Sequence, residues 1–330
     1  MARDGPPSLP LTLLLTRADV EPLLDLQQAI AITERVFLEQ ARDAVVAIPP
    51  RHVTVPRGHL RIVSGALLET QRMGVRLSPA SGGTNERAVA LLYDSENGDL
   101  LCVMPYPSGT LRTGATIAVA TKFLARNDAR TVAMIGTGRN ALSVLQAARH
   151  VRPINSVRIY SRDAERRAAF AQRARTALGF PVEAVSEIEA ATRGADIIYV
   201  ATNSLTPVLH GGSLASGVFV ASMGRPSEID PSVYLTARRI VVGHKKHEEG
   251  YFALGQYRHQ LLELVKNGKI EWNSVIQMCD VVAGRAPARK SVDEVVVFKE
   301  SGGGFGDIAF ADWIYAQARK KGLGQEWSFS

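Results

Sequence analysis

The spacing of Gly136 and Gly138 is typical of a turn that binds a pyrophosphate. An apolar run over 132–135 predicts a β-strand before this turn, and the run over 141–150 predicts a helix after it. Gly136 allows the tight turn, and Gly138 lets the backbone approach phosphates, while the free N–H groups at the helix start favour negative charge. The segment therefore predicts a dinucleotide-binding βαβ unit.

The elements that must position this turn follow along the chain. A second strand is predicted over 157–160, and two more over 194–202 and 217–222, with helix-compatible segments between them. Ala141 provides the third small residue where helix and strand pack closely. Alternating strands and helices predict an α/β fold with a Rossmann-type, doubly wound parallel sheet.

The end of the second predicted strand indicates which dinucleotide binds. Enzymes that use NAD usually carry Asp or Glu there, to bind the ribose hydroxyls. This chain has Ser161 and Arg162 instead, and a guanidinium matches the charge and geometry of a 2′-phosphate. We therefore expect NADP, with NAD as the alternative. Arg166 and Arg167 fit this reading or a solvated helix face equally well, and Asp163 is placed to cap the next helix.

Composition sets broader bounds. The 330 residues allow two domains, and a hydrophobic content of 46% with a charged content of 22% is ordinary for a globular protein. The net charge of +7 is scattered, without the aromatic interleaving of a nucleic-acid site, so we expect no nucleic-acid partner. Cys102 and Cys279 have no metal-ligand neighbours at short spacing, so we expect reduced thiols and no metal. No stretch is long enough to span a membrane, and the chain is expected to be cytoplasmic.

The first third of the chain has a different residue pattern. Residues 19–42 predict two amphipathic helical segments, and residues 53–103 alternate apolar and polar residues between turns. Asn97-Gly98 is a hairpin signal. These patterns predict a separate α+β domain with a mostly antiparallel sheet.

The chain as a whole resembles the ornithine cyclodeaminase/μ-crystallin family. The segments that carry the resemblance, in the family's order, are Pro50-Arg51, Gly74-Val75-Arg76, the run 112–116, the run 136–140, the run 202–208, Glu228-Ile229-Asp230, and the run 298–302 with Asp307. The resemblance implies a discontinuous α+β substrate and dimerisation domain over 1–115 and 308–330. It also implies a Rossmann domain over 116–307, and a homodimer.

The resemblance further implies which residues bind the substrate and cofactor. In the family, three cationic side chains hold the substrate carboxylate, and they match Arg51, Arg76 and Arg112 here. Arg76 replaces the family's usual Lys, so carboxylate binding survives but a proton-transfer role does not, because arginine stays protonated. The cofactor-binding residues expected on these grounds are Thr113, Gly136, Thr137, Gly138, Arg139, Asn140, Ser161, Arg162, Thr202, Asn203, Ser204 and Met223.

A second departure from the family lies at Ser222. Cyclodeaminases carry an Asp six residues before the Glu-Leu/Ile-Asp motif, and this chain has Ser222 there, with Glu228 or Asp230 as alternative carboxylates. A serine hydroxyl is a poor base unless a second base activates it. His244, in a segment rich in titratable groups that follows a predicted strand over 239–242, is a candidate replacement, and so is His247. The alternative for both histidines is a solvated loop that precedes a helix.

These expectations combine into one function. The resemblance implies hydride exchange between a nicotinamide and the α-carbon of an amino or imino acid, so we expect an imine reductase or amino-acid dehydrogenase. The change at Ser222 disfavours the ornithine reaction, and a cyclodeaminase with recycled NAD is therefore the alternative. A binding protein without catalysis, holding NADP(H) or a small ligand, is the alternative from another class.

Overall fold

The computed structural model describes residues 11–80, 87–107, 109–253, 258–300 and 304–328. Internal contacts divide the chain into two units. The first unit comprises Met1–Asp25, Asp43–Gly109 and Gly303–Ser330, and the second comprises Leu26–Arg42 and Thr110–Gly302. Leu26–Arg42 is grouped with the second unit, although it lies between two segments of the first unit in the chain.

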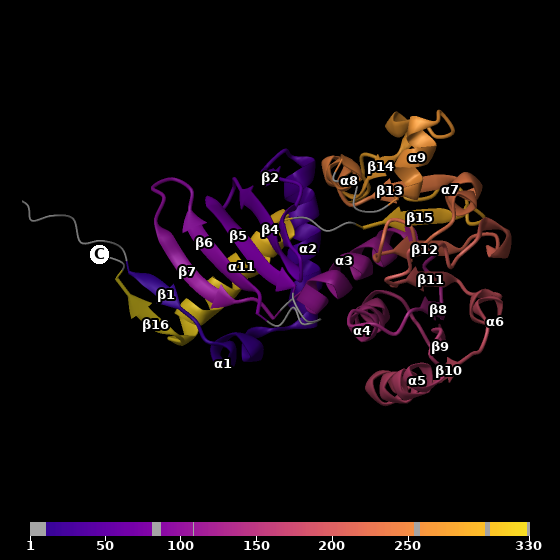
Figure 1. The fold of residues 1–330 in the computed structure, drawn as a ribbon, viewed down its shortest axis with the longest axis horizontal. Helices are drawn as coiled ribbons and strands as arrows, with labels where there is room; N and C mark the ends of the chain where they lie inside the picture. The colour runs from indigo at the N-terminus through magenta and orange to yellow at the C-terminus, as the bar shows by residue number, and fades with distance from the viewer. Residues whose placement is uncertain (1–10, 81–86, 108, 254–257, 301–303, 329–330) are drawn as a thin grey trace, which may run out of the picture. The chain divides into compact units, whose positions relative to one another are not determined.

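The first unit is built on an eight-stranded mixed sheet. Its strand order is β16-β1-β7-β6-β5-β4-β2, with β3 paired to β4, and every pairing except β1 with β7 is antiparallel. The long helix α11 packs across β4 and β5, as the yellow helix of Figure 1 shows. Its elements are β1 (Thr12–Leu14), α1 (Arg17–Val20), β2 (Val45–Ala47), β3 (Arg51–Val55), β4 (Gly58–Leu67), β5 (Arg72–Ala80), β6 (Val89–Asp94), β7 (Leu100–Pro105), α11 (Gly304–Lys321) and β16 (Gln325–Trp327).

The second unit is built on an all-parallel sheet in the order β10-β9-β8-β11-β12-β15-β13-β14. Its strands are β8 (Thr131–Ile135), β9 (Ser156–Tyr160), β10 (Val182–Ala184), β11 (Ile197–Val200), β12 (Phe219–Ser222), β13 (Arg239–Val242), β14 (Ile276–Gln277) and β15 (Val296–Lys299). All residues of β11, β12 and β15 are buried, as expected for parallel strands covered on both faces. The predicted Rossmann-type sheet is confirmed.

Helices cover both faces of this parallel sheet, and Figure 1 shows α4 and α6 on opposite faces. The helices of the second unit are α2 (Leu26–Ala41), α3 (Gly109–Leu124), α4 (Ala141–Val151), α5 (Ala164–Leu178), α6 (Ile188–Thr192), α7 (Pro231–Thr236), α8 (Lys245–Ala253), α9 (Gln260–Lys266) and α10 (Met278–Val282). No helix in the described ranges combines the length and apolarity that a membrane span requires. Cys102 and Cys279 are free and buried, and burial raises the pKa of each thiol to about 12.

The strand order places a topological switch between β8 and β11. From β8 the chain adds β9 and β10 on one side, and then returns to place β11 on the other side of β8. In open parallel sheets, ligands bind outside the carboxyl ends of the strands at such a switch. The segments that follow β8, β9, β11 and β12 are therefore where a dinucleotide site is expected.

Candidate functional site

The glycine turn follows β8 directly. Gly136 has a φ of +107°, and its N–H donates to the Tyr160 carbonyl over 2.8 Å. A Cβ at this position would lie 2.4 Å from the Ala201 carbonyl oxygen, so the fold itself requires glycine there. At Gly138, by contrast, a Cβ would meet nothing closer than the same oxygen at 3.9 Å. Packing against the protein therefore does not require a glycine at position 138. Because Gly138 has no side chain, the space over the turn stays open, which fits a bound phosphate.

Helix α4 starts immediately after this turn, at Ala141. Asn140 occupies the N-cap, but its side chain makes no capping hydrogen bond. The first N–H groups of the helix are therefore left without a side-chain cap, which suits an anion at this end. Thr137 and Arg139 lie in the same turn, so the predicted pyrophosphate residues are contiguous at the carboxyl end of β8.

The end of β9 carries the predicted ribose-binding residues. Asp163 caps α5 by accepting from the Arg166 N–H at 3.0 Å, as the sequence suggested, and also pairs with the Arg166 guanidinium. Arg167 donates to the Ser161 carbonyl and lies over the Tyr160 ring at 5.9 Å.

Arg162 differs from these two arginines. It is exposed, and within the described part of the chain its side chain makes no hydrogen bond or ion pair. Arg162 is thus the cation at this strand end that is available to a ligand.

The loops that follow β11 and β12 converge on Glu228. This carboxylate accepts hydrogen bonds from the Thr202 N–H at 2.8 Å, the Thr202 hydroxyl at 3.0 Å, the Ser222 hydroxyl at 2.7 Å and the Gly224 N–H at 2.7 Å. Glu228 is fully buried, and burial raises its pKa, while Lys299 and these donors act in the opposite direction. The sequence-based site did not include Glu228 as a primary residue. The sequence feature that could have identified Glu228 is its place as a carboxylate in a family motif that lies between two apolar segments.

Ser222 lies at the last position of β12 and is fully buried. Its hydroxyl donates to Glu228 Oε1, so the serine is part of the Glu228 network. Of the other residues predicted here, Asn203 is exposed, Ser204 and Met223 are half-buried, and the Ser204 hydroxyl donates to the Thr206 carbonyl at 2.6 Å. The structure therefore brings Thr202, Ser222 and the Met223–Gly224 backbone into one cluster.

The segment around His244 forms the start of a helix, where the sequence allowed a solvated loop. His244 immediately precedes α8, and its ring centroid lies 4.7 Å from that of His247. Burial, together with His247 and Lys246, lowers the pKa of His244 to about 4. At neutral pH this imidazole is uncharged, so it can accept a proton but does not act as an imidazolium acid.

The buried Glu248 pairs with His259. Glu248 Oε2 lies 2.7 Å from His259 Nε2, and both side chains are almost fully buried. Among the residues that the structure describes, no three His, Cys, Asp or Glu side chains are grouped to hold a metal ion.

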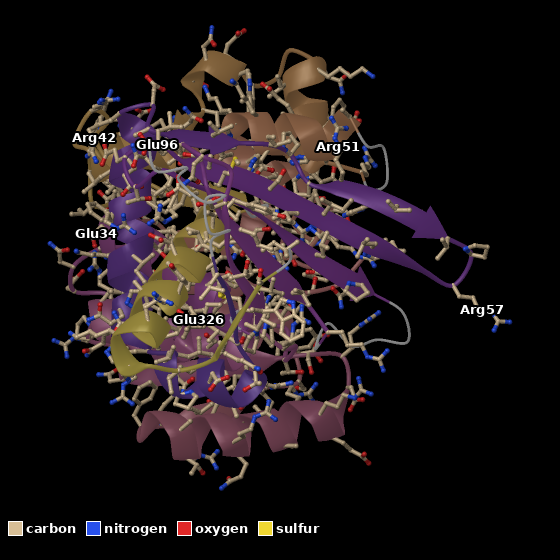
Figure 2. The ribbon with its side chains drawn as sticks, turned by 90° about the vertical axis from the view of Figure 1, so that its left-hand side faces the viewer. Glu34, Arg42, Arg51, Arg57, Glu96 and Glu326 are labelled. Atoms are coloured by element: carbon tan, nitrogen blue, oxygen red, sulfur yellow. The ribbon has the colours of Figure 1, made fainter. Side chains whose placement is uncertain are left out.

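The three arginines assigned to the carboxylate lie in different surroundings. Arg51 begins β3 and is exposed. Figure 2 shows it at one end of this strand, with Arg57 at the tip of the β3–β4 hairpin. No described residue forms an ion pair or hydrogen bond with the Arg51 guanidinium. Arg112 lies in the first turns of α3, in the second unit, beside Thr113, and both are half-buried.

Arg76 is instead buried in the first unit. Its Nε donates to Asp307 Oδ2 at 2.9 Å, and its Nη1 donates to the Ser78 hydroxyl at 2.7 Å. The Tyr106 hydroxyl donates to the other Asp307 oxygen at 3.0 Å, and the Arg76 guanidinium lies 5.5 Å from the centroid of the Tyr106 ring. Asp307 and Ser78 thus fix the orientation of the guanidinium, which leaves its Nη2 without a hydrogen bond among the described residues.

Comparisons with known proteins agree with this architecture. The model of the ornithine cyclodeaminase/mu-crystallin family matches residues 11–322. A Delta(1)-pyrroline-2-carboxylate reductase from Bacillus cereus is 32% identical over 247 residues, which cover 73% of this chain and 74% of that protein. An iminosuccinate reductase from Paracoccus denitrificans is 27% identical over 329 residues, which cover 95% of this chain and 99% of the relative.

Two solved structures resemble the whole chain. One is Thermococcus litoralis Delta(1)-pyrroline-2-carboxylate reductase in complex with NADH and L-proline. It has a TM-score of 0.86 and 27% identity, covering 95% of this chain and 99% of that one. The other is an archaeal alanine dehydrogenase dimer with bound NAD, with a TM-score of 0.86 and 26% identity, covering 97% of this chain and 100% of that one.

Proposed function

The chain belongs to the ornithine cyclodeaminase/mu-crystallin family, and from this premise we propose that it is an NAD(P)-dependent oxidoreductase that interconverts an imino acid and an amino acid. The observation that carries the proposal is the glycine turn at the topological switch, with open space at Gly138 and an uncapped helix start at α4. Relatives of about 30% identity include reductases of C=N bonds, which supports the reaction class.

The nicotinamide, when bound, supplies or accepts the hydride. The residues of this chain bind and orient its partner: Arg51, Arg76 and Arg112 are the proposed ligands of the substrate carboxylate, because guanidinium groups match its charge and planar geometry. Arg76 can do so only through the Nη2 end that Asp307 and Ser78 leave available. His244 is proposed as the group that accepts a proton in the oxidative direction, and its lowered pKa makes it a weak base at neutral pH.

We further propose NADP as the preferred dinucleotide. Arg162 at the end of β9, beside Ser161, is exposed and has no side-chain partner among the described residues. It supports this choice, because a 2′-phosphate is a dianion that a guanidinium binds well. The relatives of known structure contain NADH or NAD, so NAD is the alternative. A homodimer is proposed as well, and exposed Val53, Val55 and Met73 on the sheet of the first unit are consistent with a covered surface.

The test is a spectrophotometric screen of NADPH and NADH oxidation. It covers cyclic imines, and pyruvate, glyoxylate and oxaloacetate, each with ammonia or methylamine. We expect turnover with at least one imino acid and a preference for NADPH. The variant Arg112→Leu is expected to lose turnover while it keeps the fold, and normal activity of that variant would contradict the assignment.

A cyclodeaminase is the second candidate, because a carboxylate oxygen of Glu228 lies 2.7 Å from the Ser222 hydroxyl, near the position of the family's Asp. Glu228 is fully buried and already accepts four hydrogen bonds, which leaves it poorly suited to deprotonate an amine. Release of ammonia from ornithine without net formation of NADH would favour this candidate over the reductase.

A further inference from the structure

Glu228 joins two loops that are distant in the chain. Its Oε2 accepts both hydrogen bonds from Thr202, in the segment after β11, and its Oε1 accepts from Ser222 and from the Gly224 N–H, at the end of β12. All four donor–acceptor distances lie between 2.7 and 3.0 Å. One side chain therefore satisfies the polar groups at the carboxyl ends of two adjacent strands of the sheet.

The Gly224 peptide is also held from its other side. Lys299, fully buried at the end of β15, donates from Nζ to the Gly224 carbonyl at 3.0 Å. A Cβ on Gly224 would lie 2.2 Å from Glu228 Oε2 and 2.3 Å from the Thr202 carbonyl oxygen. Only a glycine fits between these groups, so the backbone after β12 has little freedom to move.

We infer that Glu228 is a positioning residue for the nicotinamide half of the dinucleotide. The inference rests on the proposed function, in which the dinucleotide extends from the glycine turn after β8 along the carboxyl ends of β11 and β12. The Thr202–Ser204 and Met223–Gly224 segments then border the nicotinamide, and Glu228 holds both segments in place without contacting the cofactor. Among the described residues, the pyrophosphate turn at Gly136 and Gly138 has no hydrogen bond to Glu228. Gly136 packs against Ala201, so the turn meets the Thr202 segment through the backbone, and we expect the adenosine half to depend on Glu228 less than the nicotinamide half does.

The conservative variant Glu228→Gln tests this role. A glutamine amide has one acceptor oxygen and one NH2 group that donates, so either orientation turns the NH2 toward donors of Thr202 or of Ser222 and Gly224. We expect the affinity for NADH and the kcat each to fall by about tenfold or more, since two hydrogen bonds to a charged acceptor are lost. Affinity for ADP-ribose, which lacks the nicotinamide, is expected to change less than about twofold. Titration calorimetry with the full-length protein measures both affinities.

Two further variants complete the design. Ser222→Ala removes one donor and leaves the carboxylate in place, so it is expected to shift NADH affinity in the same direction but less. Glu294→Gln is the matched control: this carboxylate lies just before β15, at the amino ends of the strands rather than the carboxyl ends, where it accepts from Arg239 Nε and the Lys290 N–H. It is expected to leave both affinities unchanged.

The outcomes separate the inference from the proposed function. Unchanged NADH affinity and kcat in Glu228→Gln would overturn the inference alone, and so would parallel losses of NADH and ADP-ribose affinity, which indicate a general structural role. If Glu228→Gln does not fold, the NADH and ADP-ribose affinities of Ser222→Ala are compared instead, and the same outcomes support or overturn the inference. Failure of the wild-type protein to bind NADH or NADPH would refute the proposed function, and the inference with it.

Discussion

Arg76 and Asp307 form a buried ion pair, with Arg76 Nε 2.9 Å from Asp307 Oδ2, although 231 positions separate them in the chain. The pair links β5 to α11, so the C-terminal helix is fastened to the sheet by charge as well as by apolar packing. An arginine that the sequence assigns to the substrate therefore has a second task, which is to stabilise the first unit.

The first prediction concerns this pair. The variants Asp307→Asn and Arg76→Leu each leave one charged side chain buried without its partner, so we expect each to lower the free energy of unfolding by about 3–5 kcal/mol. Arg76→Lys keeps the charge and is expected to lose less. Urea denaturation measures the differences. The exposed pair of Arg17 and Glu21 is the control, and Arg17→Leu should cost less than about 1 kcal/mol. Equal losses in the buried and exposed pairs would contradict the prediction.

The two glycines of the pyrophosphate turn should respond differently to alanine. Gly136→Ala forces a side chain onto a residue with a φ of +107° and against the Ala201 carbonyl, so we expect stability to fall by more than about 1 kcal/mol. Gly138→Ala meets no protein atom closer than 3.9 Å, so stability should stay within about 0.5 kcal/mol of wild type. Affinity for NADH should nevertheless fall by at least about tenfold, because the added methyl group occupies the space over the turn.

Thermal unfolding and NADH titration check both glycine variants. Wild-type affinity for NADH in Gly138→Ala would show that the turn does not bind the pyrophosphate. A stable Gly136→Ala would show that the contact with Ala201 is more easily relieved than the geometry indicates.

Local patterns predicted much of this fold, and long-range contacts account for what they missed. The apolar run before Gly136 and the helix from Ala141 are periodic over a few residues, and the structure has β8 and α4 there. The Arg76–Asp307 pair and the Thr202–Glu228 bond join residues that are far apart in sequence, and no local pattern specifies them. Helix α8 begins at Lys245, inside the segment that the sequence allowed to be a loop before a helix, and the reason is different.

That segment, with its run of charged and histidine residues, is typical of a solvated loop. Its hydrophobic and polar residues do not show a helical period, yet His247 and Glu248 are buried in α8. The pairing with His259 gives one oxygen of the buried Glu248 carboxylate a partner, and only the folded chain reveals that partner.

The third prediction concerns dinucleotide preference. Arg162→Ala removes the exposed cation at the end of β9, so affinity for NADPH should fall by about 10- to 100-fold, the range expected for a charge-assisted hydrogen bond to phosphate. Affinity for NADH should stay within about twofold. Ser161→Asp adds a carboxylate that repels the 2′-phosphate and can accept from the ribose hydroxyls, so it should reverse the preference.

Fluorescence titration with both cofactors measures the ratio. Arg166→Ala is the matched control, because Arg166 is already paired with Asp163 and is expected to change the ratio little. An unchanged NADPH affinity in Arg162→Ala would assign the chain to NAD.

The last prediction concerns the pH dependence of stability. Burial and the neighbouring His247 lower the pKa of His244 to about 4 in the folded protein, against 6.5 for the free side chain. Between these values the unfolded chain binds the proton more tightly, so the contribution of His244 to stability is complete above pH 6.5 and is lost as the pH falls toward 4. After a discount for its partial exposure, the loss is on the order of 2 kcal/mol.

Urea denaturation at pH 7.5 and at pH 4.5 measures this loss. We expect acidification to lower the free energy of unfolding less in His244→Gln than in wild type. His150→Gln is the control: this histidine is exposed on α4, so the variant should behave as wild type does. The same acid dependence in His244→Gln and wild type would show that other groups destabilise the protein at low pH.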